Sequence, residues 1–404
     1  NVLALLGHKV TREYYLNDAG NQINILGNSI HLRLEELMGK NIEFPDDHYQ
    51  GGYIIDLAKE LLELHHTAAT VEYCKEYGVK RILEIIKKEL DDFGISFDSW
   101  YSQRSLEKSG KIEKAIAFLK EKGFIYEQEK ATWFSSTRFQ DDKDRVVIKS
   151  DGSYTYLAPD IAYHRDKFER GYDWLINLWG PDHHGYIPRL KASVEALGKE
   201  RDALNVIIVQ LATLLKAGKV ISMSTRKGEY ITLRQVLDEV GSDAARFFFL
   251  MRKTDSHLDF DLELAKQKTS ENPVYYVQYA HARIARILDN AKVHPALSQK
   301  GGIHLSQMQK ADLSLLKEKE EINLLKAISR FENCLRIVES QLDPYCLTSY
   351  LQELAERFHC FYDKVRVLVD DSELKCARLA LVQGCKNVIA LGLRLLGVKA
   401  PEKM

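Results

Sequence analysis

Cysteine is sparse in this sequence and forms none of the patterns that bind zinc or carry a redox pair. The six cysteines are spread over 404 residues, and no two stand as a Cys-x-x-Cys pair, so we expect reduced side chains that lie mostly in the core. The longest apolar run near the start, Val2 to Leu6, is far shorter than the roughly 20 residues of a membrane span and lacks the features of a signal peptide. These absences predict a cytoplasmic protein with no membrane segment.

An excess of charge of one sign is also lacking. Lys and Arg number 57 and Asp and Glu number 58, which leaves a net charge of −1. A global basic field is therefore excluded, and any contact with nucleic acid has to come from a local patch. Residues 272–404 hold 19 Lys and Arg against 15 Asp and Glu, so the C-terminal part is the mildly basic one.

An α/β pattern occupies the middle of the chain. Apolar strand candidates at Trp174–Trp179 and Val206–Leu211 flank a helix predicted over Pro188–Leu197. A strand, a loop, a helix and a second strand in succession favour a parallel sheet.

Helical periodicity dominates two other stretches, from about residue 21 to 123 and from residue 272 onward. The hydrophobic share of 45% over 404 residues predicts two or three folded domains. We therefore predict an α/β domain over residues 1–270, interrupted by a helical insertion over about 21–123, and an all-α domain over residues 271–404.

A hydroxyl-rich and basic loop is the sharpest local signal. Its residues follow a buried strand candidate and precede a helix: Ser222, Met223, Ser224, Thr225, Arg226 and Lys227. Backbone N–H groups, hydroxyls and cations on such a loop stabilise the charge that builds on a leaving pyrophosphate. The alternative is a solvated basic turn, which the composition also fits.

Tyr156 and Asp160 lie where a strand candidate runs into a helix whose first turn contains Pro159. Residues four apart share a helix face, and α/β sheets bind ligands at the carboxyl ends of their strands. A carboxylate there can pair with a planar cation through two hydrogen bonds. The alternative is that Asp160 only favours the dipole at the start of its helix.

A glycine-bounded turn follows the first of the two strand candidates and contains Asp182, His183 and His184 between Gly180 and Gly185. Adjacent side chains point in different directions, and no further His or Cys stands at ligand spacing, so a metal site is not favoured. We expect a polar pocket edge, at which a histidine reaches a substrate phosphate or ribose and the glycines permit close approach.

Aromatic and cationic side chains alternate on a helix predicted near residue 360. Tyr362, Lys364 and Arg366 suit nucleic acid, because aromatic faces stack on unpaired bases and cations meet phosphates. The alternative is that Phe358, Phe361 and Tyr362 are core residues at helical spacing.

Six motifs occur in one order along the chain, and as a set they resemble arginyl-tRNA synthetase of the bacterial type, a class I aminoacyl-tRNA synthetase. The motifs are Tyr14–Ile23, Tyr156–His164, Trp179–Gly185, Met223–Arg226, Asp243–Arg246 and Asn272–Arg283. The match covers essentially the whole chain. The resemblance implies a Rossmann-like catalytic domain with a helical insertion, an α-helical anticodon-binding domain after it, and a monomer.

The resemblance also implies an arginine–tRNA ligase, which makes arginyl-adenylate from L-arginine and ATP with Mg²⁺ and transfers the arginyl group to tRNA(Arg). Arginine would be bound by Tyr156, Asp160 and Asp182. ATP and the adenylate would be bound by Gly180, His183, His184, Met223 and Ser224. The catalytic signature loop would be Ser222 to Lys227, and tRNA would be bound by Tyr362, Lys364 and Arg366.

The chain departs from the family pattern in two places. Ser222 and Thr225 stand where the loop usually has two lysines. The His-x-Gly-His segment that binds the ATP phosphates is absent, and Gly7-His8 is only half of such a pattern. Because Asn1 to Leu6 read as the end of a helix, we expect that the chain begins inside a longer protein. Because half of the ATP site would be missing with the His-x-Gly-His segment, we expect this chain alone to be inactive or nearly so.

Two other functions remain open from the residues. One is a different adenylating ligase on the same fold, which acts on a small amino acid without tRNA. The other is a non-catalytic tRNA-binding module. Stimulation by tRNA distinguishes the first from an arginine–tRNA ligase, and binding of arginine distinguishes the second.

Overall fold

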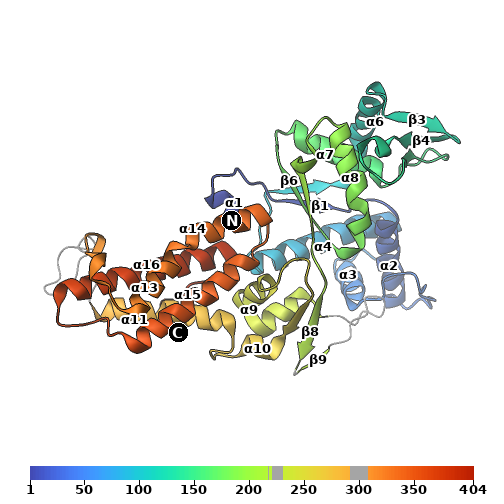
Figure 1. Ribbon diagram of the computed structural model, residues 1–404. Coiled ribbons are helices and arrows are strands. Elements are labelled where there is room, and N and C mark those ends of the chain that lie inside the picture. The colour runs from blue at the N-terminus through green and yellow to red at the C-terminus, as the bar shows by residue number, and fades with distance from the viewer. Residues whose placement is uncertain (217, 221–230, 292–307) are drawn as a thin grey trace.

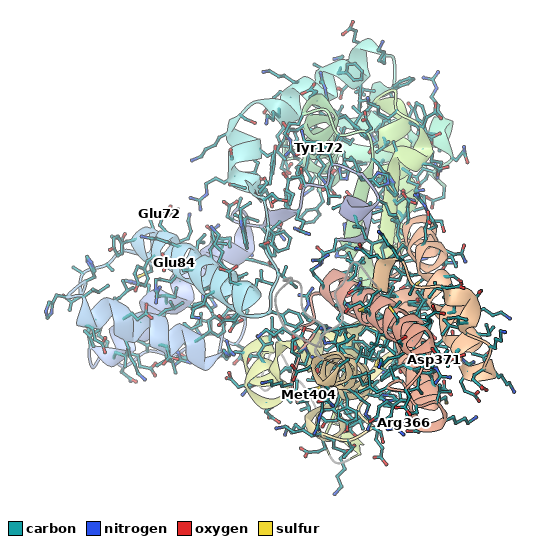
Figure 2. The ribbon with its side chains drawn as sticks, turned by 90° about the vertical axis from the view of Figure 1, so that its left-hand side faces the viewer. Glu72, Glu84, Tyr172, Arg366, Asp371 and Met404 are labelled. Atoms are coloured by element: carbon teal, nitrogen blue, oxygen red, sulfur yellow. The ribbon has the colours of Figure 1, made fainter. Side chains whose placement is uncertain are left out.

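The computed structural model describes residues 1–216, 218–220, 231–291 and 308–404. These parts form three lobes that meet near the first strand (Figures 1 and 2). One lobe is a bundle of helices from the C-terminal third, one holds the three helices that follow the first strand, and one combines helices with short sheets. The boundaries predicted at about residues 21, 123 and 270 stay predictions.

A parallel strand pair forms the centre of the α/β lobe. Strand β6 (Leu175–Trp179) pairs with β7 (Leu204–Ile208), helix α8 (Ile187–Ala196) connects them, and α7 (Leu157–Glu169) precedes β6. Parallel strands need such a crossover, because a short hairpin cannot return the chain to the same end. The strand, helix and strand predicted for this stretch are confirmed.

The first strand pairs with a segment for which only helix was predicted. Strand β1 (Glu13–Leu16) runs parallel to β2 (Ser99–Ser102), which lies inside the helical stretch expected over about 21–123. The prediction was wrong at these four residues. The aromatic side chains of β2 fit a half-buried pleated surface, and the ring of Trp100 stacks on Tyr14 with 4.8 Å between centroids.

A third group of strands lies beside the bundle. Strand β8 (Ala212–Lys216) pairs in parallel with β10 (Leu258–Asp261) and antiparallel with β9 (Lys219–Val220). Helices α9 (Leu233–Leu250) and α10 (Leu262–Lys266) pack next to them. Their apolar side chains join the core of the bundle, so this part links the α/β lobe to the helices.

The insertion has a core of its own. Helices α2 (Asn21–Leu37), α3 (Gly52–Glu63) and α4 (Val71–Asp92) bury a separate set of side chains between them: Leu26, Ile30, Leu34, Ile54, Leu57, Ala58, Leu61 and Cys74. At Gly78 a Cβ atom would lie 2.4 Å from the Cδ1 atom of Ile30. A larger residue there would force the Ile30 side chain to shift within this core.

A small antiparallel sheet extends the α/β lobe. After α5 (Gln103–Lys108) and α6 (Lys111–Glu121), strands β3 (Ile125–Gln128), β4 (Ala131–Phe134) and β5 (Arg145–Ile148) pair in sequence order. Their buried side chains pack with those of α6 and α7 in one cluster. The short 3-10 helices in the described chain are Ser136–Phe139, Pro181–Tyr186 (η2), Arg201–Ala203 and Leu313–Leu315.

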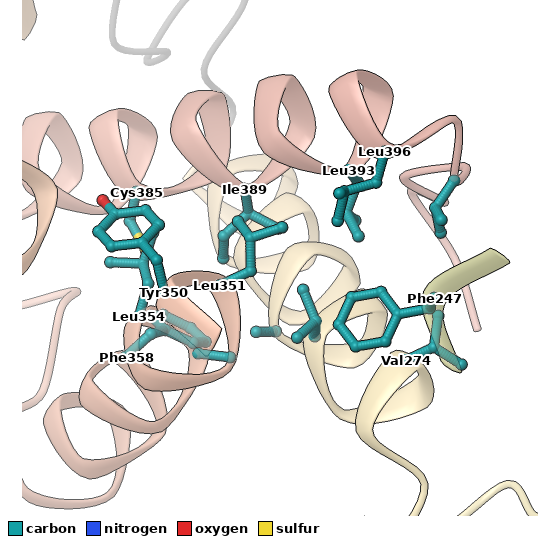
Figure 3. Close-up of a cluster of buried hydrophobic side chains, with 14 of the residues drawn as sticks. Phe247, Val274, Tyr350, Leu351, Leu354, Phe358, Cys385, Ile389, Leu393 and Leu396 are labelled. Carbon is teal, nitrogen blue, oxygen red and sulfur yellow. The ribbon is translucent and has the colours of Figure 1, made fainter. Parts of the chain in front are cut away.

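The C-terminal lobe is a helical bundle around one large core. Its helices are α11 (Pro273–Asn290), α13 (Lys319–Ser329), α14 (Phe331–Gln341), α15 (Tyr345–Lys364) and α16 (Ser372–Leu396), with α1 (Val2–Leu5) against α14. Figure 3 shows Cys385 and Ile389 of α16 facing Leu351 and Leu354 of α15. The amphipathic helices predicted for this part are confirmed.

Helix α16 is the one helix of the described residues that is long and apolar enough to cross a membrane by length and composition. One of its faces lies in the bundle core, where Val382, Ile389 and Leu393 are fully buried. A core helix passes the same test of length and composition, so the packing of α16 accounts for its apolar sequence.

A single arginine joins the ends of two helices from different lobes. Arg246 in α9 donates to the carbonyl oxygen of Leu396 at 3.0 Å and to those of Phe93 and Gly94 at 3.0 and 3.2 Å. The last carbonyls of a helix lack partners within it, and a cation is favoured there. At Gly397, where φ is 72°, a Cβ atom would lie 2.4 Å from Nη2 of Arg246. The insertion, α9 and the bundle therefore meet at one guanidinium group.

Candidate active site

Asp160 lies in the first turn of α7 and is half-buried. Burial disfavours the charged carboxylate and raises the pKa of Asp160 to about 6, while a hydrogen bond from Tyr186 and the more distant charges of Lys167 and His183 act in the opposite direction. Among the described residues, Asp160 makes no ion pair. Within the described chain, this half-buried carboxylate therefore has no cation in ion-pair contact with it.

Tyr186 is the side chain that contacts the Asp160 carboxylate. Its hydroxyl donates to Oδ2 of Asp160 at 2.7 Å. Tyr186 ends η2 and caps α8, so the hydrogen bond joins the turn after β6 to the start of α7. Tyr186 was not among the predicted site residues, and its position directly after the Gly-Pro-Asp-His-His-Gly turn is the one feature of the sequence that points to it.

A buried histidine holds the first turn of α7 against strand β6. Nδ1 of His164 donates to the carbonyl oxygen of Asp160 at 2.7 Å, so its Nε2 accepts from Asn177 of β6 at 2.9 Å. Burial lowers the pKa of His164 to about 3, which keeps the ring neutral. Lys167 lies close by, 3.4 Å from Oδ1 of Asn177, and burial lowers its pKa to about 8.

The other end of α7 is attached to the first strand pair. Glu13 of β1 accepts hydrogen bonds from Tyr163 at 2.5 Å, from Ser99 of β2 at 2.9 Å, and from Arg170 at 2.7 and 3.0 Å. Burial alone would raise the pKa of Glu13, but these hydrogen bonds hold it below its usual value. Glu13 therefore joins the first strand pair to the middle and the C-terminal end of α7.

The glycine-bounded turn predicted as a pocket edge forms η2 at the carboxyl end of β6. Asp182, His183 and His184 are exposed in it, and the His183 ring lies 6.0 Å from the ring of Trp179. The described residues contain no group of three or more His, Cys, Asp or Glu side chains that could hold a metal ion. The structure brings η2 and the start of α7 to the same place through the Tyr186–Asp160 contact.

Tyr156 has a different environment from Asp160. Its side chain is 86% exposed, and its contact with Asp160 runs through the backbone, where the carbonyl of Tyr156 accepts from the amide of Asp160 at 3.3 Å. Binding of arginine by both side chains stays a prediction. The signature loop of Ser222, Met223, Ser224, Thr225, Arg226 and Lys227 lies outside the described residues, so its roles stay predictions as well.

An aromatic surface lies on the bundle, where α11 and α15 are adjacent. We define it by four side chains, which are Tyr275, Tyr279, Arg283 and Tyr362. The Arg283 guanidinium lies 4.6 Å from the ring centroids of both Tyr279 and Tyr362, and the rings of Tyr275 and Tyr279 stack at 6.0 Å. Tyr275, Tyr279 and Arg283 were missed, although their spacing of four residues marks one helix face.

The residues predicted near the end of α15 separate in the structure. Phe358 and Phe361 are fully buried, as the core interpretation predicts, whereas Tyr362 is 42% exposed. Lys364 forms an ion pair with Glu320 at 2.8 Å. Arg366 is exposed in the loop after α15, at the outer side of the bundle (Figure 2).

Comparison with known proteins identifies both parts of the chain. The family described as tRNA synthetases class I (R), catalytic domain, matches residues 1–286, and the DALR anticodon binding domain matches residues 277–404. The arginine–tRNA ligase of Syntrophotalea carbinolica is 48% identical over 410 residues, which cover all of this chain and 73% of the relative. The arginine–tRNA ligase of Bacillus subtilis is 46% identical and is covered to 72%.

Solved structures agree with these relatives. A crystal structure from Campylobacter jejuni that is assigned to an arginyl-tRNA synthetase superposes with a TM-score of 0.89 at 38% identity, over all of this chain and 87% of that one. The arginyl-tRNA synthetase of Thermus thermophilus shares the fold, with a TM-score of 0.74 at 21% identity. By both parts of its sequence and by its fold, the chain belongs to the arginyl-tRNA synthetases.

Proposed function

We propose that this chain carries the arginine-activating site and the anticodon-binding site of an arginine–tRNA ligase. In this reaction the carboxylate of L-arginine displaces pyrophosphate from ATP, and a hydroxyl of the terminal adenosine of tRNA(Arg) then takes the arginyl group from the adenylate. We propose further that the protein acts as a monomer in the cytoplasm, as expected of a translation enzyme.

Asp160 carries this proposal as the partner of the arginine guanidinium. Its carboxylate is half-buried, its side-chain hydrogen bond comes from a neutral tyrosine, and it makes no ion pair with another described residue. Burial of an ionised carboxylate costs free energy unless a cation pairs with it. A planar guanidinium meets a carboxylate through two parallel hydrogen bonds, which the point charge of lysine cannot make. Tyr156 is free to close over the ligand, because its side chain is exposed.

The adenylate is proposed to lie along η2. Asp182 would contact the arginyl part, and Gly180, His183 and His184 would contact the nucleotide, since they are exposed beside the Asp160 site. Ser222 to Lys227 would stabilise the departing pyrophosphate, with Met223 and Ser224 next to the nucleotide. Mg²⁺ would arrive with the phosphates of ATP, because the described residues offer no group of side chains that would hold it.

The aromatic surface is proposed to bind unpaired anticodon bases of tRNA(Arg). One exposed ring, Tyr362, and two partly exposed rings, Tyr275 and Tyr279, lie beside a guanidinium, so this surface offers stacking and a positive charge at one place. Tyr362 belongs to this surface, and Arg366 in the following loop would reach a phosphate. Lys364 would contribute less than Arg366, because Glu320 already pairs with its ammonium group.

Calorimetric titration with arginine tests the role of Asp160, with lysine and citrulline as competing ligands. Asp160→Asn removes the charge and keeps the shape, and we expect arginine affinity to fall at least about a hundredfold, as for a buried charge pair that loses one partner. Asp144→Asn is the matched control, because Asp144 also accepts from a tyrosine, Tyr126, but in the antiparallel sheet.

Unchanged arginine affinity in Asp160→Asn would refute the assignment of this carboxylate. Binding of tRNA without any binding of arginine would favour a non-catalytic tRNA-binding module instead. Arginine-dependent exchange of pyrophosphate into ATP, measured on residues 1–404 and on the intact protein, tests separately whether this chain is inactive alone.

A further inference from the structure

We propose that Tyr186 is a positioning residue for arginine recognition, which orients the Asp160 carboxylate so that one of its edges faces the guanidinium. This inference rests on the function proposed above for Asp160. Tyr186 is not required to touch arginine. Its hydroxyl acts through the carboxylate that it holds.

The tyrosine ring is fixed on several sides. Trp179 packs edge-on against it, with 5.8 Å between ring centroids, and the guanidinium of Arg189 lies 5.0 Å from the ring centroid. The ring contacts two separate hydrophobic clusters, one around α6 and α7 and one around β6 and α8. Because the hydroxyl lies at the tip of this fixed ring, the direction in which it can donate is set by packing.

Asp160 is held at its carboxylate by Tyr186 and, separately, at its backbone by His164. Tyr186 donates to Oδ2 at 2.7 Å, and the backbone carbonyl of Asp160 accepts from His164 at 2.7 Å. An ionised carboxylate has four lone-pair positions, so one hydrogen bond to Oδ2 leaves the whole of Oδ1 and part of Oδ2 open. That edge suits a guanidinium, which donates two parallel N–H bonds.

A neutral partner has a chemical advantage over a charged one. A hydrogen bond from tyrosine favours the ionised carboxylate but adds no positive charge, so the full negative charge remains for the ligand. Burial raises the pKa of Tyr186 itself, and the charge of Asp160 adds to this, so the hydroxyl keeps its proton at neutral pH. A lysine or arginine in its place would neutralise the carboxylate and compete with the substrate.

Other charged and titratable groups face Asp160 and enter the test. Lys167 of α7 and His183 of η2 favour its ionised form, and Tyr15 of β1 is close enough for its own pKa to respond to Asp160. Arg145 faces Tyr186, but its guanidinium is committed to Asp141 at 2.8 and 2.9 Å. None of these groups makes a hydrogen bond to the carboxylate in the described part of the chain, so the effect of Tyr186 is separable from theirs.

Tyr186→Phe in the intact protein tests the proposal, because it keeps the ring and removes the hydroxyl. We expect the KM for arginine to rise about tenfold, as for a lost hydrogen bond to a charged group, with kcat at saturating arginine within about twofold. The acid limb of kcat/KM for arginine should move up by roughly one pH unit. Tyr126→Phe is the control, since it removes the hydrogen bond to Asp144 and should change neither quantity.

A second variant keeps the test decisive if Tyr186→Phe unfolds. Incorporation of 3-fluorotyrosine at position 186 makes the hydroxyl a stronger donor without removing it, so the acid limb should move down instead of up. One outcome is that Asp160→Asn abolishes arginine binding while both Tyr186 variants leave the KM and the acid limb unchanged, as Tyr126→Phe does. That result would refute the positioning role of Tyr186 and leave the assignment of Asp160 in place. If Asp160→Asn leaves arginine binding intact, the function proposed for Asp160 falls and this inference falls with it.

Discussion

A buried ion pair in the bundle gives the most decisive prediction about stability. Glu321 in α13 is fully buried, and its Oε1 accepts from Nε of Arg378 in α16 at 2.6 Å. Its other carboxylate oxygen accepts from the backbone amide of Glu318 at 2.8 Å, and Arg378 also donates to the carbonyl of Arg366 at 2.9 Å. The pair therefore joins two helices to the loop that carries Arg366.

Glu321→Gln should destabilise the bundle strongly. The substitution removes the negative charge and leaves the Arg378 guanidinium buried without an anion, which costs about 3–5 kcal/mol. A domain of this size has a total stability of roughly 5–15 kcal/mol, so much of its margin would be lost. For a domain of this size, the loss corresponds to a midpoint of thermal unfolding lower by roughly 10–20 °C.

Thermal unfolding followed by circular dichroism measures this loss, with Glu320→Gln as the control. Glu320 is the preceding residue and pairs with Lys364 at the surface, where an ion pair contributes little. The double variant Glu321→Leu with Arg378→Met should recover most of the stability, because an apolar pair leaves no unpaired charge. The reasoning would be refuted if Glu321→Gln lowered the midpoint no more than Glu320→Gln does.

Three further predictions concern the contact that Arg246 makes between the lobes, the arginine site and the aromatic surface. Gly397→Ala should cost about 1–3 kcal/mol of unfolding free energy, because its positive φ and the nearby Arg246 guanidinium leave no room for a methyl group; an unchanged urea midpoint would contradict this. Arginine affinity should fall about tenfold per pH unit as the pH drops below about 6, because Asp160 then takes up a proton. Calorimetry at pH 5 and 7.5 measures this fall in affinity, and equal affinities at the two pH values would refute the assignment of Asp160. Tyr279→Ala should weaken tRNA binding by about 1–3 kcal/mol, seen by filter binding, while arginine affinity stays unchanged.

Much of the fold could be predicted because it depends on local patterns. The apolar strands at Trp174–Trp179 and Val206–Leu211 and the helices after residue 272 follow from periodicity, and the structure confirms them apart from shifts of a few residues at the ends. Strand β2 could not be predicted, because four residues between two helices carry little pattern of their own. Its conformation depends on pairing with β1, which lies 86 residues earlier.

The candidate site could be predicted only in part, for a related reason. Asp160 stood out through its place between a strand candidate and a helix, but its contact with Tyr186 joins residues 26 positions apart. No local pattern reveals that contact, since it depends on how α7 and η2 meet. The ion pair of Lys364 is similar, because its partner Glu320 lies on another helix and changes what the lysine can offer to a phosphate.

The joint at Arg246 also constrains the order in which the protein can be completed during synthesis. Its acceptors at Phe93 and Gly94 leave the ribosome long before Arg246 does, whereas Leu396 follows 150 residues later. Domains generally fold as they emerge, starting with the N-terminal ones. The insertion and α9 can therefore dock first, and the nascent chain keeps an incomplete guanidinium site until α16 has been made. Helix α16 therefore completes a contact whose other two acceptors and whose donor are already in place when it is translated.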